Sequence, residues 1–286
     1  MLQSNIMFGI ILSGISAFFA EIASSIGKRK VEKHEISVYT MAFLNMFWGA
    51  LVFFLIAIFI RKNFQFSIES LPTFSIRAIL ELAQMHFSYF ALAVADRSAF
   101  GFVRTGTIPL LLIIDIVLGY AITIFHIIGI FIIAIGFMIL FLNHGIRKKG
   151  LGFIIFTTIN AAVTISLFKY NITNFNSVEA EQGLITVILM IYFFIMAYYT
   201  AKENPLSFFK KPIFLTQSVV SGISSVISSF AYIFAPSSII TAARRSFDVL
   251  LSIVCGNVYF NEKHLGIKIF AMFFVVSGII VLALYS

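Results

Sequence analysis

Ten apolar stretches of membrane-spanning length fill the 286-residue chain, and this pattern constrains the fold more than any single motif. A helix needs about 20 predominantly apolar residues to cross a hydrocarbon core about 30 Å thick. The expected spans are 6–26, 37–60, 76–95, 98–119, 122–142, 150–169, 179–201, 213–234, 238–258 and 265–285. Because these stretches are continuously apolar rather than alternating, they predict helices and not the strands of a barrel.

The second half of the chain repeats the first at a nearly constant offset. Residues 91–98 (ALAVADRS) align with 231–238 (AYIFAPSS), and Arg104 aligns with Arg244, in both cases 140 positions apart. The offset becomes 142 for two later pairs, Gly129 with Ala271 and Gly136 with Gly278. We therefore expect two five-helix units, residues 1–145 and 146–286. An odd number of spans per unit predicts that the two units are inverted repeats.

The composition excludes a soluble domain. Hydrophobic residues make up 60% of the chain and charged residues 11%, whereas soluble domains carry about 25% charged residues. The first apolar stretch lacks a basic leader and a small-residue cleavage site, so we interpret it as a span and not as a signal peptide. We expect a multi-pass all-α membrane protein of a bacterial cytoplasmic (inner) membrane, surrounded by lipid, as a monomer or weak dimer.

Short motifs in both halves resemble a known transporter pattern. Residues 89–92 (YFAL), the turn at 95–98 and a following helix with Pro109 are similar to the EamA-type pattern of the drug/metabolite transporter superfamily. In the second half, residues 259–262 (YFNE) are followed sixteen positions later by Gly278, similar to the family's glutamate-then-glycine ending. The resemblance implies ten helices in two inverted repeats and secondary transport without a cofactor.

Two positions depart from this family pattern, and the charge distribution conflicts with its usual topology. Tyr120 stands where the first-half glutamate is expected, and Ala271 replaces a glycine. Loops after odd-numbered spans hold thirteen Lys or Arg, and loops after even-numbered spans hold three: Arg61, Lys62 and Arg77, the last at a helix start. The positive-inside rule places both termini outside, whereas relatives usually have them in the cytoplasm. The net charge of +8 is dispersed among loops, so we expect no nucleic-acid partner.

A second resemblance concerns the first span. Residues 17–28 (AFFAEIASSIGK) are similar to the first helix of small multidrug resistance proteins, in which the glutamate of A-x-x-A-E binds protons or a cationic substrate. The resemblance implies that Glu21 couples transport to a proton. Small residues share its face, which favours close contact with a neighbouring helix. The alternative is a glutamate near the span end that reaches solvent beside Lys28.

Charged residues within the spans are the main candidates for a binding site, since each costs about 2.5–3.5 kcal/mol on insertion scales. Arg104 lies about six residues into the fourth span, and Arg244 and Arg245 lie equally deep in the ninth. Two arginine clusters from opposite halves suit a carboxylate or phosphate on a substrate. The alternative is local neutralisation of Arg244 and Arg245 by Asp248, a pair that could also open and close as a coupling element.

Polar stripes on four spans indicate either a shared cavity or contacts between helices. The third span carries Glu81 and Gln84 on one face and His86 on another, and His86 is either a proton relay or a packing residue. Asn160 belongs to a similar stripe in the sixth span. The full stripes are Glu81, Gln84 and Ser88; Thr157, Asn160 and Thr164; and Gln217, Ser221, Ser224 and Ser228. Trp48 and Tyr89 are the aromatic candidates for the cavity, and Glu179 and Glu181 are expected to be solvated.

The leading interpretation is a secondary transporter of a small polar or amphipathic metabolite, working by alternating access. The arginines favour an anionic group and Glu21 a cation or proton, so an amino acid or similar zwitterion satisfies both. The coupling partner is then a proton or a counter-substrate. An exchanger of organophosphates, nucleotides or nucleotide sugars would use the arginines alone. An intramembrane enzyme is the alternative from a different class, but the chain lacks the G-x-x-x-x-G-K-[ST], H-E-x-x-H and G-x-S-x-G motifs, so we expect no catalytic and no metal site.

Overall fold

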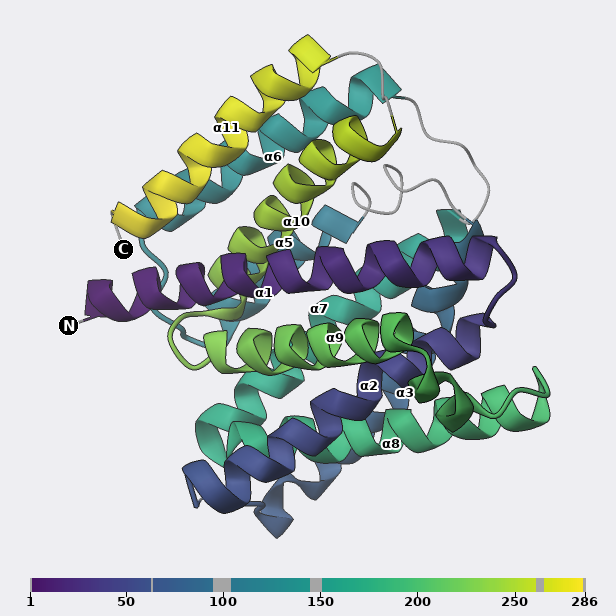
Figure 1. The fold of residues 1–286 in the computed structure, drawn as a ribbon. Helices are drawn as coiled ribbons and strands as arrows, with labels where there is room; N and C mark the ends of the chain where they lie inside the picture. Colours follow the sequence, from purple (N-terminus) through teal and green to yellow (C-terminus); the bar gives the residue numbers. More distant parts are fainter. Residues whose placement is uncertain (1, 63, 95–103, 145–150, 261–264, 285–286) are drawn as a thin grey trace.

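The fold is an assembly of long helices (Figure 1). The computed structural model describes residues 2–62, 64–94, 104–144, 151–260 and 265–284, and these residues contain no strand. The α-helices are α1 (Leu2–Glu32), α2 (Val38–Leu55), α3 (Leu71–Val94), α5 (Thr107–Val117), α6 (Ile124–His144), α7 (Leu151–Asn174), α8 (Val178–Tyr199), α9 (Pro212–Ala231), α10 (Ser237–Phe260) and α11 (Leu265–Leu284). Three short helical turns, η1 (Ile56–Ile60), η2 (Ile68–Ser70) and η3 (Pro205–Lys210), join α2 to α3 and α8 to α9.

Within the described ranges, five helical segments are long and apolar enough to cross a membrane. They are Asn5–Glu32, Val38–Ile60, Gly152–Asn174, Val178–Tyr199 and Pro212–Ala231. Shorter apolar helices cover Thr107–Val117, Ile124–Ile139 and Phe270–Leu282. The all-helical, membrane-type fold expected from composition is therefore confirmed at this level, with helices at all the predicted positions that the structure describes.

Helix starts recur in the two halves at the offset seen in the sequence. Ser37 precedes α2, and its side chain accepts a hydrogen bond from the Thr40 amide. Ser177 precedes α8, and its side chain accepts one from the Ala180 amide. A serine in this position satisfies an amide that the first helical turn leaves without a partner. Both caps therefore perform the same local task, 140 positions apart.

Helix ends recur in the same way. The Arg61 amide donates to the Ile56 carbonyl at 2.9 Å, and the Ala201 amide donates to the Met196 carbonyl at 3.3 Å. Each of these hydrogen bonds spans five residues, and the residue after its donor is a lysine with positive φ, 49° at Lys62 and 58° at Lys202. Non-glycine residues seldom adopt this conformation, so its appearance at two positions 140 apart indicates that the connections share one design.

The packing partners of the helices also correspond between the halves. Helix α1 packs against α9 and α10, and α7 packs against α3 and α5, while α2 pairs with α8 and α6 with α11. Figure 1 shows α11 lying along α6 and α1 lying along α9, with both chain termini on the side opposite the α1–α2 and α8–α9 turns.

Small residues allow the closest of these approaches. A Cβ added to Gly278 would lie 2.7 Å from the Gly129 carbonyl oxygen, and one added to Gly136 would lie 3.0 Å from the Ala271 carbonyl oxygen. These four residues are the ones that aligned at an offset of 142. Exchanging each residue for its counterpart converts the first contact between α6 and α11 into the second.

Some sequence predictions lie outside the described residues. They are the first-half turn at 95–98, the glutamate expected at the end of the 259–262 motif and the boundary between residues 145 and 146.

Candidate functional site

Five of the predicted charged residues meet between α3, the turn before α5, and α10. Arg104 lies in the helical turn that precedes α5. The charges of Arg245, Asp248, Arg244 and Glu81 all act on its guanidinium group. Glu81 comes from α3, and the other three residues come from α10. The structure therefore brings together residues from both halves of the chain, as the sequence predicted for Arg104 and Arg244. We call these five residues the central charged cluster.

Counted over the described residues, the central charged cluster has more cations than carboxylates, and it is partly exposed. Arg245 and Asp248 lie 3.6 Å apart, with side-chain exposures of 16% and 31%. Arg244 donates a hydrogen bond to the Ser228 hydroxyl of α9 instead of pairing with Asp248. Three arginines thus face two carboxylates, one of which, Glu81, also pairs with Arg77 at 3.7 Å. Such a cluster can bind an anionic group while leaving a carboxylate for a cationic one.

Gln84 and Asn160 join two helices. The Asn160 side-chain amide donates to the Leu80 carbonyl at 2.7 Å and to the Gln84 side chain at 3.3 Å. Thr164 donates to the same Gln84 oxygen at 3.0 Å. Both Gln84 and Asn160 are buried. These contacts join α3 to α7 one turn from Glu81. In this structure Gln84 and Asn160 therefore position the helix that carries Glu81.

Tyr89 lies within reach of the central charged cluster, and Trp48 lies near a helix crossing. The Arg104 charge acts on Tyr89, whose hydroxyl accepts a hydrogen bond from Asn45 at 3.3 Å. The Asn45 oxygen in turn accepts one from Gln217 at 3.0 Å. Trp48 follows Asn45 by three residues on α2, and its indole nitrogen has no hydrogen-bond partner among the described residues. Asn45, which sequence reasoning missed, connects α2, α3 and α9.

Glu21 and His86 occupy separate surroundings. The Glu21 carboxylate accepts a hydrogen bond from the Ser25 hydroxyl at 3.1 Å, one turn further along α1. His86 Nδ1 lies 2.7 Å from the Tyr192 hydroxyl of α8, and its ring contacts Tyr39 and Phe90. This arrangement matches the packing interpretation of His86. The described contacts of His86 do not connect it to the central charged cluster.

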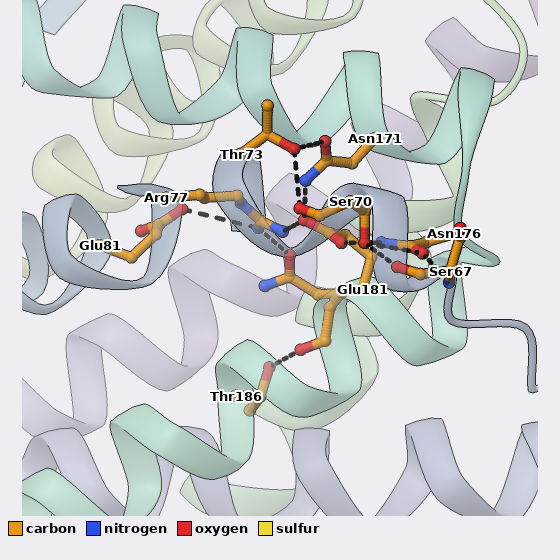
Figure 2. A network of polar contacts seen from close by, with 10 residues as sticks. Ser67, Ser70, Thr73, Arg77, Glu81, Asn171, Asn176, Glu181 and Thr186 are labelled. Atoms are coloured by element: carbon orange, nitrogen blue, oxygen red, sulfur yellow. Dashed lines mark hydrogen bonds and ion pairs between the residues drawn. The ribbon is translucent and has the colours of Figure 1, made fainter. Parts of the chain in front are cut away.

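A second, largely buried polar network corrects two expectations of the sequence analysis (Figure 2). Arg77, expected at a helix start and counted with the loop charges, is 1% exposed, and Glu181, expected to be solvated, is 0% exposed. Arg77 Nη1 donates to Glu181 at 2.7 Å, and the same carboxylate accepts from Asn171 at 2.9 Å and Asn176 at 2.6 Å. The Arg77 guanidinium also lies 4.6 Å from the centre of the Phe168 ring. Further members shown in Figure 2 are Ser67, Ser70 and Thr73.

Both corrections follow from the packing of α3, α7 and α8 against one another, which buries Arg77 and Glu181. Helix α3 begins at Leu71, five residues before the predicted start, so Arg77 lies inside the helix and faces α7 and α8. Glu179 is buried as well, and it forms an ion pair with Arg61 at 3.1 Å. A buried carboxylate is tolerated where a cation and hydrogen-bond donors compensate its lost hydration. Glu181 has both, whereas the Glu179 oxygens have no hydrogen-bond partner among the described residues and depend on the Arg61 charge.

A third set of charged residues, Lys169 and Asp115, forms hydrogen bonds at the corner between α9 and α10. Lys169 of α7 donates to the carbonyl of Tyr232, the residue that ends α9, at 2.6 Å. Asp115 of α5 accepts from the amide of Ser238, in the first turn of α10, at 2.7 Å. A cation at a helix C-terminus and an anion at a helix N-terminus both oppose the helix dipole favourably. This corner is the 231–238 motif of the sequence repeat.

Comparisons with known proteins show the fold and no activity. No known protein family and no curated protein matches the chain. A solved structure described as "Crystal structure of protein" matches 99% of this chain and 99% of its own, with a TM-score of 0.70 and 14% sequence identity. Within the described residues, no group of three or more His, Cys, Asp or Glu could hold a metal ion. The fold and site thus define an all-α, membrane-type protein with charged residues clustered between its helices.

Proposed function

We propose that this protein is a secondary transporter that moves a small zwitterionic metabolite, such as an amino acid, by alternating access. The observation that carries the proposal is the central charged cluster. Its residues come from α3 and the turn before α5 in one half and from α10 in the other. A ligand bound there would contact both halves, so a relative movement of the halves could expose it to one side and then to the other.

The architecture that we propose is ten membrane spans in two inverted five-helix repeats, as in EamA-type drug/metabolite transporters. The exchangeable packing partners support a two-fold relation, since α1 with α9 corresponds to α7 with α3, and α2 with α8 corresponds to itself. The paired contacts of Gly129 with Gly278 and of Gly136 with Ala271 support it independently. Five spans per repeat would invert the second copy in a bacterial cytoplasmic membrane.

A zwitterion fits the charges better than a pure anion or cation. One carboxylate of the ligand would meet Arg104 and the arginines of α10, and its ammonium group would meet Asp248, which retains 31% exposure. The second candidate is an exchanger of organophosphates, nucleotides or nucleotide sugars. Among the described residues the cluster holds three arginines and two carboxylates, and this ratio favours the exchanger, because phosphates carry more charge than carboxylates.

Binding to Arg104 is tested by thermal unfolding of the purified protein with amino acids, nucleotides, sugar phosphates and quaternary amines. We expect amino acids to raise the unfolding temperature. Arg104→Gln should weaken that binding by about 2 kcal/mol or more, because truncation leaves a charged ligand group without its partner. This loss corresponds to roughly 30-fold in the dissociation constant. Arg29→Gln, at an exposed arginine, is the matched control. Unchanged binding by Arg104→Gln would remove this arginine from the site, and stabilisation by phosphates alone would favour the exchanger.

We propose that Glu21 couples transport to a proton, on the basis of its partly buried position in α1 and its contact with Ser25. In proteoliposomes, Glu21→Gln should abolish accumulation driven by a pH gradient but retain exchange of internal for external substrate. The reason is that glutamine keeps the hydrogen-bonding shape but cannot release a proton. Glu69→Gln, at an exposed glutamate, is the control. Gradient-driven accumulation at the wild-type rate in Glu21→Gln would rule out the coupling role.

A further inference from the structure

Two connections that are distant in sequence form one basic surface. They are the end of α1 with the turn before α2, and the connection from α8 to α9, which lie on the same side in Figure 1. Lys30 and Lys211 each lie 5.9 Å from the centre of the same Phe214 ring, and the charges of Lys30, Lys33 and Lys211 all act on Glu35. The cations of this surface, which we call the basic face, are Lys28, Arg29, Lys30, Lys33, Lys202, Lys210 and Lys211.

The basic face keeps a net positive charge after its acidic residues are counted. Seven cations face three carboxylates, Glu32, Glu35 and Glu203. A hydrogen bond from Lys30 at 2.7 Å lowers the pKa of the Glu35 carboxyl, so this group stays ionised at neutral pH. The Glu203 carboxylate is occupied by the Ser37 amide at 3.0 Å and by the Ser37 and Thr40 hydroxyls. An excess of four positive charges therefore remains.

The opposite end of the molecule has no such excess in the part of the chain that is described. Its connection from α2 to α3 carries Arg61, Lys62 and Glu69, and Arg61 pairs with the buried Glu179. Arg77, which the sequence analysis assigned to this side, forms a buried ion pair with Glu181 and adds no charge to the surface. The α2–α3 end is therefore less positive than the count of Lys and Arg in the loops indicates, and the excess of positive charge lies on the basic face. Such an excess normally faces the cytoplasmic leaflet, where anionic lipids concentrate.

A cavity of about 380 Å³ opens at the basic face between the end of α1 and the start of α2. Its polar lining includes Lys28, His34 and the Ser37 hydroxyl, with Glu32, which lies 3.8 Å from Lys28, as the acidic member. Its apolar lining consists of Val31, Ile36, Val38 and Met41. A lining that combines charged and apolar side chains suits the junction between a lipid headgroup and its acyl chains.

We propose that the basic face binds anionic phospholipid headgroups and that one such lipid occupies the cavity between α1 and α2. The phosphate would lie against Lys28 and His34, within reach of the exposed Lys33, and the first methylenes of the acyl chains would cover Val31 and Met41. The other lysines of the face would attract further anionic headgroups without a pocket. This interaction does not depend on the transported substrate.

The test titrates the purified full-length protein in a non-ionic detergent with phosphatidylglycerol, phosphatidylcholine, glycerol 3-phosphate or inorganic phosphate. Thermal unfolding and native mass spectrometry are the readouts. We expect phosphatidylglycerol to raise the unfolding temperature and to remain bound, and the other three to do neither. Lys28→Gln combined with Lys33→Gln should weaken phosphatidylglycerol binding by about five-fold for each lysine removed. Lys62→Gln, at the opposite end, should bind as the unmodified protein does.

Three results would overturn the proposal. Phosphatidylcholine binding as tightly as phosphatidylglycerol would show that charge does not select the lipid. Saturation by inorganic phosphate or glycerol 3-phosphate would assign the cavity to a free phosphate compound. A double variant that binds phosphatidylglycerol as the unmodified protein does would exclude Lys28 and Lys33. If circular dichroism shows that the double variant does not fold, the single variants Lys28→Gln and Lys33→Gln carry the same comparison.

Discussion

Arg77→Met is expected to lower the free energy of unfolding by about 3–5 kcal/mol, because it leaves buried carboxylates without their cation. Glu181 is 0% exposed and receives its shortest charged contact from Arg77 at 2.7 Å. Two asparagine amides remain on Glu181 in the variant, but neither carries a charge. Glu81, 3.7 Å from Arg77, loses a cation too. The loss should therefore exceed that of any exposed arginine by several-fold.

A double-mutant cycle separates this charge effect from lost packing. Glu181→Gln should be less damaging than Arg77→Met, because Arg77 keeps Gln182 and Glu81 as partners. The double variant should lose less than the sum of the two single losses, since neither charge is then left alone. Unfolding in a graded denaturant, followed by helical circular dichroism, gives the four free energies. Arg29→Met is the exposed control. Additive losses, or an Arg77→Met loss equal to that of Arg29→Met, would contradict the interpretation.

The helices were predictable because their signal is local. An apolar run of spanning length predicts a helix without reference to the rest of the chain, and the run at 179–201 became α8 (Val178–Tyr199). The meeting of Arg104 with Arg244 and Arg245 also followed from the sequence, because the repeat placed both clusters at equal depth in corresponding helices. Apolar runs thus indicate where the helices lie, and the repeat indicates which residues of the two halves correspond.

The buried pair was not predicted, because solvation depends on which helices pack together. Glu181 lies one turn inside α8, a position that is normally wet, and only the arrival of α3 and α7 buries it. The repeat does not reveal the pair either, because its members have uncharged counterparts in the other half. At an offset of 140, Arg77 replaces Gln217 and Glu181 replaces Met41. Gln217 and Met41 both lie next to Gly27, so the corresponding place in the other half holds two uncharged side chains.

The polar stripes show the limit of a pattern read from one helix. Gln217, Ser221, Ser224 and Ser228 of α9 follow a single face, which suits either a cavity or a helix contact. In the structure Ser221 donates to the Asn45 carbonyl at 3.1 Å and Ser224 to the Ser16 carbonyl at 2.8 Å. Most of the stripe therefore joins α9 to α1 and α2. Only the identity of the neighbouring helix distinguishes the two interpretations, and the sequence of α9 does not contain it.

The α9–α10 corner is expected to give the second large effect. Lys169→Met should lower the free energy of unfolding by about 1.5–3 kcal/mol, the usual value of a hydrogen bond to a charged group. Asp115→Asn should lower it by less, because asparagine keeps a neutral acceptor for the Ser238 amide. Both side chains are nearly or fully buried, at 8% and 0% exposure. Hydrogen exchange should rise most at the Ser238 amide in Asp115→Asn, because that amide loses its carboxylate partner. Lys202→Met, at an exposed lysine, is the control for Lys169→Met.

The corner variants also test how the two halves hold together. Asp115 belongs to the first half and the amide it binds to the second, whereas Lys169 and Tyr232 both belong to the second. If the halves separate at this corner during transport, Asp115→Asn should accelerate exchange across the whole first turn of α10, and Lys169→Met should loosen only the end of α9. If both variants accelerate hydrogen exchange equally and throughout the protein, the corner stabilises the fold as a whole and does not separate during transport. Because the two charges also attract each other, the double variant should lose less than the sum of the single losses.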